Sequence, residues 1–387
     1  MNIAMGQFNP TIGDLSANAA AIERLARDAH LDGADLLLLP ELCVLGYPPR
    51  DLLLREDVVP ACEAMVERLA AGLPLPTLIG SPRRVEGGSR PIANSMALCR
   101  GGGIEAWHDK ILLPTYDVFD ENRWFQSGTT PLTFDLNGTT FGVLICEDLW
   151  QAHDVDVSRP YSRNPVSMAV DAKCEVLLVP SASPFVAGKY ERHVSLLRGI
   201  AKECGVHVVM ANQVGANDDL VFDGGSAAYL PSGAMLQALP RFTEGLLTVD
   251  LNGQSRTVEP MGAEEERFHA IVLALRDYCV KTRQPRVLLG ASGGIDSAIV
   301  AALAVAALGA TNVEVVLMPS RYSSDGSLVD ARETARCLGI SSAHELSIES
   351  LHSAAEATLG TGVLQGLADE NVQARIRGLL LMARSNA

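Results

Sequence analysis

Apolar and polar residues alternate along the first 250 positions in a way that predicts short strands separated by helices. Runs 36–40 and 176–180 are apolar throughout, which indicates strands buried on both faces. Runs 94–99 and 104–108 flank a Gly-rich loop, which predicts an antiparallel hairpin. We therefore expect an α/β fold with a layered, mixed sheet. The strands with these runs are expected at 35–40, 175–180, 94–99 and 104–108, and the remaining strands at 3–8, 77–80, 141–146, 206–212, 226–230 and 246–250. Helices are expected at 18–32, 58–71, 165–172 and 190–204.

A polar segment with Gly and Pro, residues 252–262, interrupts this pattern and is typical of a linker. Strand and helix patterns then alternate again, which predicts a doubly wound parallel sheet. We divide the chain into a first domain at 1–250, a linker and connecting helix at 251–284, and a second domain at 285–387. The second part has expected helices at 263–282, 296–308, 326–337 and 369–385 and expected strands at 286–290, 313–319 and 344–348.

Three strands are few for a domain of this class. The last helix, 369–385, carries an apolar stripe, but no further strand candidate follows it. We therefore expect the sequence to stop before this domain is complete, so that it is truncated.

Composition narrows the classes of function. The chain has 387 residues, 48% hydrophobic and 20% charged, as in ordinary globular proteins. Its net charge of −15 argues against a nucleic-acid partner. The longest apolar run, 298–308, is too short to cross a bilayer, and residues 1–10 lack the features of a signal peptide, so we expect a cytoplasmic protein without a membrane partner. The eight cysteines form no CxxC pair or His/Cys cluster, so we expect reduced thiols and no zinc.

One cysteine stands where chemistry is expected. An apolar run leads into Cys146, and active sites collect at the carboxyl ends of strands in α/β proteins. Glu41 and Lys110 follow two other expected strands. If the three side chains converge, Glu41 can take the thiol proton, Cys146 can attack a carbonyl carbon, and Lys110 can stabilise the oxyanion. Taken singly, each residue also fits a structural or solvated position.

The blocks LLLLPELCVLGY, HDKILLPTYDVFDE and LICEDLW together resemble the nitrilase, or carbon–nitrogen hydrolase, superfamily over about residues 1–250. The resemblance implies an α-β-β-α sandwich with a catalytic triad of Glu41, Lys110 and Cys146. It also implies that Glu121 is a second glutamate that supports the lysine, with a plain surface Glu as the alternative. By resemblance alone, we expect a homo-oligomer.

The longer block HDKxLLPTYDVFDExRWF is similar to the glutaminase domain of glutamine-dependent NAD synthetases. The resemblance implies that the substrate is glutamine and that Tyr116, Glu147, Ser183 and Lys189 contact it. A zwitterionic head group needs both signs of charge, which Glu147 and Lys189 can supply. Core packing for Tyr116 and a turn hydroxyl for Ser183 remain alternatives.

A second motif, LLGASGGIDS, joins an expected strand to an expected helix. Its glycines let backbone amides approach an anion, and the helix N-terminus favours negative charge, so phosphate fits here. A carboxylate beside phosphate needs a bridging cation, which predicts Mg²⁺ at Asp296. A tight turn with Asp296 as helix N-cap is the alternative. The candidate phosphate-binding residues are Gly290, Ser292, Gly293, Gly294, Asp296 and Ser297.

SGGIDS resembles the phosphate loop of ATP pyrophosphatases, and two further blocks, LMPSR and ENVQARIR, resemble NAD synthetases within that group. The resemblance implies ATP as a substrate, with Arg321 near its adenine. It also implies that Asn371 and Arg375 contact deamido-NAD. A solvated helix face is the alternative for Arg375.

An amidase that releases ammonia, joined to a domain that adenylates a carboxylate, forms a coherent pair, because ammonia converts an acyl-adenylate into an amide. The implied reaction converts deamido-NAD, ATP and glutamine into NAD, AMP, pyrophosphate and glutamate. Relatives in the family continue beyond Ala387 with a further phosphate-contacting block and a second acidic metal ligand. Three alternatives stay open: an amidase with an inactive appendage, a non-catalytic dinucleotide-binding protein, and an amidotransferase with another substrate.

Overall fold

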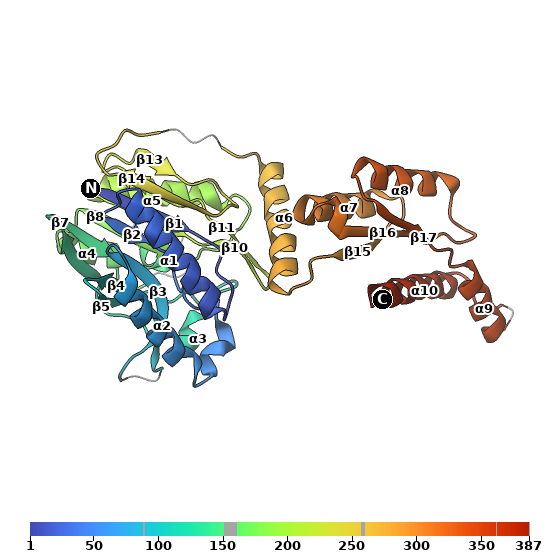
Figure 1. The fold of residues 1–387 in the computed structure, drawn as a ribbon, viewed down its shortest axis with the longest axis horizontal. Coiled ribbons are helices and arrows are strands. Elements are labelled where there is room, and N and C mark those ends of the chain that lie inside the picture. Colours follow the sequence, from blue (N-terminus) through green and yellow to red (C-terminus); the bar gives the residue numbers. More distant parts are fainter. Residues whose placement is uncertain (88–89, 151–160, 257–259, 361, 387) are drawn as a thin grey trace. The chain divides into compact units, whose positions relative to one another are not determined.

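The computed structural model describes residues 1–87, 90–150, 161–256, 260–360 and 362–386. The chain forms two compact units, Met1–Ala270 and Ile271–Ala387 (Figure 1). Residues 257–259 of the expected linker lie outside the described residues. Among the described helices, none combines the length and the apolar character needed to cross a membrane.

The first unit contains two six-stranded sheets packed face to face. The first has the order β14-β1-β2-β3-β4-β5 and the second β13-β12-β9-β8-β7-β6. The strands of the first sheet are β1 (Asn2–Gln7), β2 (Leu36–Leu38), β3 (Thr77–Arg84), β4 (Ile92–Arg100), β5 (Gly103–Asp109) and β14 (Gly245–Asp250). Those of the second are β6 (Leu132–Leu136), β7 (Thr139–Val143), β8 (Val176–Ser181), β9 (His207–Asn212), β12 (Ala227–Tyr229) and β13 (Met235–Ala238). A separate hairpin pairs β10 (Val214–Asn217) with β11 (Leu220–Asp223).

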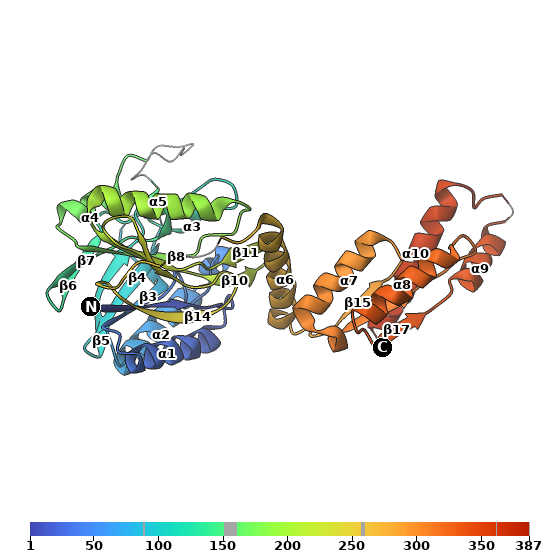
Figure 2. The same ribbon diagram turned by 90° about the horizontal axis from the view of Figure 1, so that it is seen from above.

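Helices cover the outer face of each sheet, which gives an α-β-β-α sandwich (Figure 2). Helices α1 (Leu15–Leu31) and α2 (Val58–Gly72) cover the first sheet, and α4 (Pro165–Asp171) and α5 (Lys189–Cys204) the second. Short helical turns complete the unit: η1 (Arg50–Leu54), α3 (Glu121–Trp124) and η2 (Cys146–Leu149).

Side-chain alternation explains why the central strands are apolar throughout. In β2, Leu37 packs outward with α1 and α2, whereas Leu36 and Leu38 pack inward against the second sheet. In β8, Leu177 packs outward and Leu178 inward. Successive residues of a strand point to opposite faces, so a strand between two apolar layers is apolar at every position. The sequence-based prediction of burial on both faces is confirmed.

Both sheets are mixed, as expected. Strands β1, β2 and β3 run parallel, and so do β7, β8 and β9, whereas the other pairs are antiparallel. The predicted hairpin is β4 with β5, in which Ala97 lies opposite Trp107. Several expected strands extend too far, and one of these errors concerns the site: the run 141–146 leaves the sheet after Val143, and Cys146 opens η2 with a φ of 46°. Strands β2 and, in the second unit, β17 (Ser342–Glu345) likewise end earlier than expected, at Leu38 and Glu345.

The second unit has a three-stranded parallel sheet in the order β15-β16-β17. The strands are β15 (Val287–Gly290), β16 (Val313–Leu317) and β17 (Ser342–Glu345). Helices α7 (Ile295–Leu308) and α8 (Asp325–Cys337) pack on one face, and α10 (Leu367–Ser385) packs on the other. The remaining elements are α6 (Ala263–Lys281), which continues across the division between the units, η3 (Ala310–Asn312) and α9 (Glu349–Leu359). Helices on both faces of parallel strands are the doubly wound arrangement that the sequence predicted.

At Gly80 in β3, the backbone of the first sheet lies very close to the backbone of the turn that contains Glu41. A Cβ at Gly80 would lie 2.3 Å from Leu42 N and 2.5 Å from Pro40 O. Because both are backbone atoms, Gly80→Ala has to displace the turn, and we expect it to lower the free energy of unfolding by about 2 kcal/mol or more. Gly103→Ala is the control, since its Cβ would meet nothing within 4 Å. Equal unfolding midpoints in urea for the two variants would contradict this account.

Candidate active site

Loops from both sheets of the first unit bring the candidate catalytic residues together. Glu41 lies in the turn after β2, Lys110 directly after β5, and Cys146 at the start of η2 after β7. Glu121 opens α3. All four side chains are buried, with relative exposures of 0% for Glu41, 1% for Lys110, 3% for Glu121 and 9% for Cys146. These groups are therefore largely removed from water.

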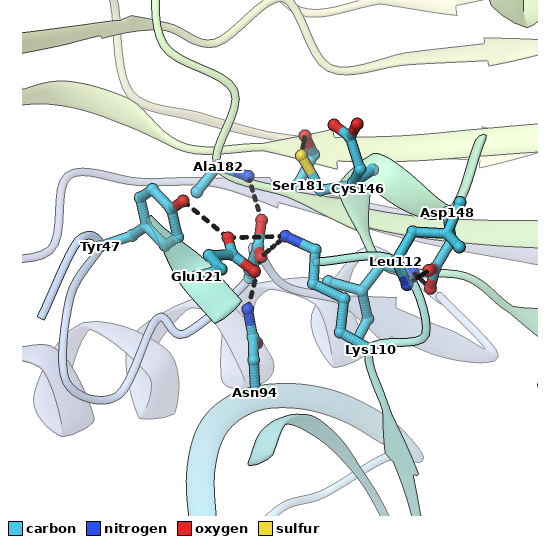
Figure 3. A network of polar contacts seen from close by, with 12 residues as sticks. Tyr47, Asn94, Lys110, Leu112, Glu121, Cys146, Asp148, Ser181 and Ala182 are labelled. Carbon is cyan, nitrogen blue, oxygen red and sulfur yellow. Dashed lines mark hydrogen bonds and ion pairs between the residues drawn. The ribbon is translucent and has the colours of Figure 1, made fainter. Parts of the chain in front are cut away.

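The ammonium of Lys110 lies between two carboxylates (Figure 3). Its Nζ is 2.7 Å from Glu41 Oε1 and 2.8 Å from Glu121 Oε1. Further donors fix each carboxylate: Asn94 Nδ2 donates to Glu41 Oε1 at 2.6 Å, and Tyr47 OH donates to Glu121 Oε1 at 2.7 Å. The structure thus places Glu121 in contact with the lysine rather than on the surface, which was the alternative for this residue.

Burial and charge shift the titration of this cluster. Burial would lower the pKa of Lys110, but the charges of Glu121 and Glu41 raise it well above its usual value. Burial raises the pKa of Glu121 to about 7, against the opposing effect of Lys110. Near neutral pH the lysine is therefore a cation, and Glu121 exchanges a proton within the physiological range.

The thiol of Cys146 rests in its neutral form. Burial, reinforced by the charge of Glu41, raises its pKa to about 12, while Lys110 and a hydrogen bond from Ser181 act in the opposite direction. The Ser181 hydroxyl donates to Cys146 Sγ at 3.3 Å (Figure 3). Because the thiolate is the nucleophile, this cysteine needs a base at the moment of attack. Glu41 is the candidate base, since its Oε2 accepts only a 3.1 Å bond from Ala182 N among the bonds described.

A third carboxylate, Glu147, lies next to the thiol along the chain and is held by two tyrosines. Tyr116 OH donates to Glu147 Oε2 at 2.9 Å, and Tyr161 OH donates to Oε1 at 2.8 Å. Burial raises the pKa of Glu147, and the bond from Tyr161 and the charge of Lys110 oppose that shift. Tyr161 was not predicted from the sequence, because no motif surrounds it.

Lys189 and Ser183 meet at the start of α5. Lys189 Nζ donates to Ser183 Oγ at 2.8 Å, and His193 Nε2 lies 3.4 Å from the same oxygen. Burial lowers the pKa of Lys189, and burial with the charge of Lys189 lowers the pKa of His193 to about 3. All three residues line a pocket together with Asp223. His193 and Asp223 are pocket residues that the sequence analysis missed.

The glycine-rich loop of the second unit runs from the end of β15 to the start of α7. Gly293 has a φ of 82°, and a Cβ there would lie 2.1 Å from Ser327 O, so only glycine fits. Ser297 Oγ donates to Gly294 O at 2.9 Å and lies 3.1 Å from Ser292 Oγ. These contacts form an ordered turn with its hydroxyl groups at the helix N-terminus.

The helix N-cap is Gly294, and Asp296 is exposed in the first turn of α7, so the N-cap alternative for Asp296 is wrong. No group of three or more potential metal-ligating side chains occurs among the residues that the structure describes. An exposed carboxylate beside a phosphate loop still fits Mg²⁺, because this ion is commonly held by one or two carboxylates and by substrate phosphates.

A pocket of about 470 Å³ opens beside the loop and is lined by Gly290, Ser292, Met318 and Arg377, among others. Arg377 Nε donates to Met318 O at 3.1 Å. Of the ligand contacts predicted for the second unit, only Gly290 and Ser292 line this pocket; the residues absent from its lining are Gly293, Gly294, Asp296, Ser297, Arg321, Asn371 and Arg375.

Arg321 Nε donates to Glu349 Oε1 at 2.8 Å, and its Nη1 lies 3.4 Å from Glu356 Oε2. On α10, the exposed Arg375 donates through Nη1 to Asn371 Oδ1 at 3.2 Å. Within the first unit, the structure therefore brings Glu41, Lys110 and Glu121 into contact, and within the second unit it forms the predicted glycine-rich loop between β15 and α7. It leaves Arg321, Asn371 and Arg375 in protein contacts of their own.

The pKa of Glu121 gives a testable dependence of stability on pH. Between about pH 4.5, the ordinary value for a glutamate, and pH 7, folded Glu121 keeps a proton that the unfolded chain loses. The folded state binds more protons in this window, so the contribution of Glu121 to stability falls as pH rises. We expect Glu121→Gln, which cannot titrate, to gain stability relative to the wild type from pH 4.5 to 7, as measured by urea unfolding. A constant difference across that range would contradict the raised pKa.

Comparisons with known proteins find matches over both units of the chain. The carbon-nitrogen hydrolase family model matches residues 2–258, and the NAD synthase model matches residues 267–387. The glutamine-dependent NAD(+) synthetase of Synechocystis is 42% identical over 399 residues, covering 99% of this chain and 72% of the relative. That of Acinetobacter baylyi is 36% identical, covering 99% of this chain and 70% of the relative.

Among solved structures, the glutamine-dependent NAD+ synthetase of Acinetobacter baumannii in complex with ADP is similar, with a TM-score of 0.91 and 35% identity. The match covers 100% of this chain and 72% of that one. A variant amidase from Nesterenkonia, with acrylamide added at its active-site cysteine, matches with a TM-score of 0.55 and 27% identity over 65% of this chain and 93% of that one. The chain therefore belongs to the family of glutamine-dependent NAD(+) synthetases.

Proposed function

We propose that this chain hydrolyses glutamine at Cys146 and uses the ammonia, with ATP, to convert deamido-NAD into NAD. The observation that carries the proposal is the buried ammonium of Lys110, held at 2.7 Å and 2.8 Å by Glu41 and Glu121 beside a buried thiol. A cation and a base at a desolvated sulfur are what amide hydrolysis through a thioester requires.

The amidase half of the proposal has two stages. Glu41 takes the proton of Cys146, and Sγ forms a bond to the side-chain amide carbon of glutamine. Lys110 donates to the oxyanion that develops, and protonated Glu41 returns its proton to the leaving nitrogen, which departs as ammonia. Glu41 then activates a water, which attacks the thioester carbon, so that the C–S bond breaks and glutamate and the thiol are released.

Recognition of glutamine is assigned to the groups around Glu147 and Lys189. A buried carboxylate held by Tyr116 and Tyr161 is suited to the α-ammonium of an amino acid. Lys189 and Ser183, which lie 2.8 Å apart, are suited to its α-carboxylate. This assignment also explains why burying both charges is tolerated, since the bound zwitterion provides a partner for each.

The synthetase half is assigned to the loop of the second unit. Backbone amides and hydroxyls of Gly290, Ser292, Gly293, Gly294 and Ser297 would hold the phosphates of ATP at the N-terminus of α7. Asp296 would hold Mg²⁺, which neutralises phosphate charge when bound. The 470 Å³ pocket beside the loop is large enough for a nucleotide base or sugar.

The remaining ligand contacts are proposals that rest on resemblance. Arg321 is assigned to adenine, and Asn371 and Arg375 to deamido-NAD, which would require Arg321 to exchange its contacts with Glu349 and Glu356 for the ligand. A homo-oligomer also rests on resemblance. A cytoplasmic location is supported by the free thiols of all eight cysteines.

Glutamate release from glutamine tests the amidase. We expect Cys146→Ala to lower its rate by about 10³-fold or more, since it removes the nucleophile. Cys174→Ala, at another buried cysteine of the same unit, should retain the wild-type rate within a few-fold. Adding ATP and deamido-NAD and measuring NAD, AMP and pyrophosphate tests the second half. Wild-type glutamate release without NAD formation would favour the alternative of an amidase with an inactive appendage.

The recognition of glutamine can be tested separately from the chemistry. We expect Glu147→Gln to raise the KM for glutamine about 10- to 100-fold, with a smaller effect on kcat, because it removes a charged partner of the substrate's α-ammonium. Glu67→Gln, at an exposed position on α2, is the control. A fall in kcat at unchanged KM would instead assign Glu147 to the chemical step.

A further inference from the structure

A fully buried carboxylate, Asp148, connects the segments that carry Lys110 and Cys146. Its Oδ1 accepts backbone N–H bonds from Ile111 at 3.1 Å and Leu112 at 2.8 Å. Its Oδ2 accepts the backbone N–H of Ile145 at 2.9 Å. Figure 3 shows the bond from Leu112 beside Lys110. One side chain therefore holds the two residues after the lysine and the residue before the thiol.

These two segments belong to different sheets. Lys110 stays with the first sheet, because its N–H donates to Asn94 O at 2.8 Å. The segment before Cys146 stays with the second sheet, because the N–H of Leu144 donates to Leu178 O at 3.0 Å. The two strands concerned, β5 and β7, are not neighbours in a common sheet. Sheet hydrogen bonding alone does not set the distance between the ammonium and the sulfur.

We propose that Asp148 is a positioning residue that fixes Lys110 relative to Cys146 for amide hydrolysis. The inference rests on the proposed function, since it assigns the oxyanion partner and the nucleophile to these two residues. Bonds from N–H groups to an ionised carboxylate are shorter and stronger than neutral ones, and three of them hold Asp148 in one orientation. Displacing a catalytic group by about 1 Å can lower the rate about 10²-fold. Loss of the fixed separation between Lys110 and Cys146 should therefore be measurable as a loss of rate.

His108 supplies an internal control, because it lies near Asp148 without a hydrogen bond to it. Its Nδ1 accepts the N–H of Leu132 at 3.3 Å, which leaves the hydrogen on Nε2 in the neutral ring. That nitrogen lies 3.6 Å from Asp148 Oδ2, beyond hydrogen-bonding distance. Changing His108 alters the surroundings of the carboxylate but leaves its three backbone contacts in place.

Asp148→Asn is the sharpest variant. It keeps the size of the side chain but replaces one acceptor oxygen with an NH₂ group, which faces a backbone N–H in either orientation of the amide. The variant then loses either the bonds from Ile111 and Leu112 or the bond from Ile145, and keeps the other. Asp148→Ala removes all three backbone hydrogen bonds, and His108→Gln removes none of them.

The experiment measures kcat and KM for glutamate release. It also measures the rate at which iodoacetamide alkylates Cys146. Both rates are normalised to the folded fraction of the protein, as determined by circular dichroism. We expect Asp148→Asn to lower kcat roughly 10- to 100-fold with KM changed less than threefold, Asp148→Ala to lower kcat further, and His108→Gln to change it less than threefold. Variants that lose thermal stability but keep the wild-type kcat would overturn the proposal. So would an equal loss of kcat in His108→Gln.

A measurement on the wild-type protein covers the case in which the variants do not fold. In protein labelled with ¹⁵N-leucine and ¹⁵N-isoleucine, we expect the amides of Leu112 and Ile145 to exchange with deuterium far more slowly than the exposed Leu54. Exchange as fast as that of Leu54 would overturn the proposal. Wild-type protein that alkylates at Cys146 but releases no glutamate would reject the proposed function instead, while the alkylation rates of the variants would still test Asp148.

Discussion

The burial of one ammonium between two carboxylates is the constraint on which the first unit depends. Removing a charge from water is costly unless partners and hydrogen bonds replace the lost solvation, and breaking such a set leaves an unpaired buried charge. Lys110, Glu41 and Glu121 therefore have to be brought together from separate segments, and Asn94 and Tyr47 provide the remaining donors. This requirement is met where the loops of two sheets converge.

The same burial sets the reactivity of the thiol. A pKa near 12 keeps Cys146 protonated, so its sulfur is a weak nucleophile until a base takes the proton. The left-handed backbone at Cys146, with a φ of 46°, turns the chain at the start of η2, after it has left β7 at Val143. Strain at a single residue persists where surrounding contacts over-determine it, and those contacts include Asp148.

The sequence alone predicted the strands whose apolar residues are buried, but it did not predict turns that depend on local backbone geometry. The apolar runs that became β2 and β8 could be identified, because both faces of these strands are covered. Strands β6, β10, β11 and β13 were not predicted: all four are only four or five residues long, and β6 and β13 are also partly exposed. The turn at Cys146 was read as strand, because an apolar sequence carries no signal for a positive φ. Tyr161 lies in no motif, and although Asp148 belongs to the block LICEDLW, its hydrogen bonds to Ile111, Leu112 and Ile145 are made only in the folded chain and could not be predicted.

The candidate amidase site is buried, whereas the glycine-rich loop of the second unit is largely exposed, and this difference suits the chemistry proposed for each. In the amidase mechanism that we propose, thiol chemistry gains from a dry site, since the attraction between Lys110 and a developing oxyanion would strengthen as water is excluded. Phosphate binding begins from solvent, and in the second unit Ser292 and Asp296 are exposed at a helix N-terminus. In the proposed role of this loop, a phosphate would be held by backbone amides at the helix N-terminus, with Mg²⁺ at Asp296 in place of a buried protein charge. Ammonia formed in a dry site is released as the neutral nucleophile, and this is the form that an acyl-adenylate requires, because protonation in water would remove its lone pair.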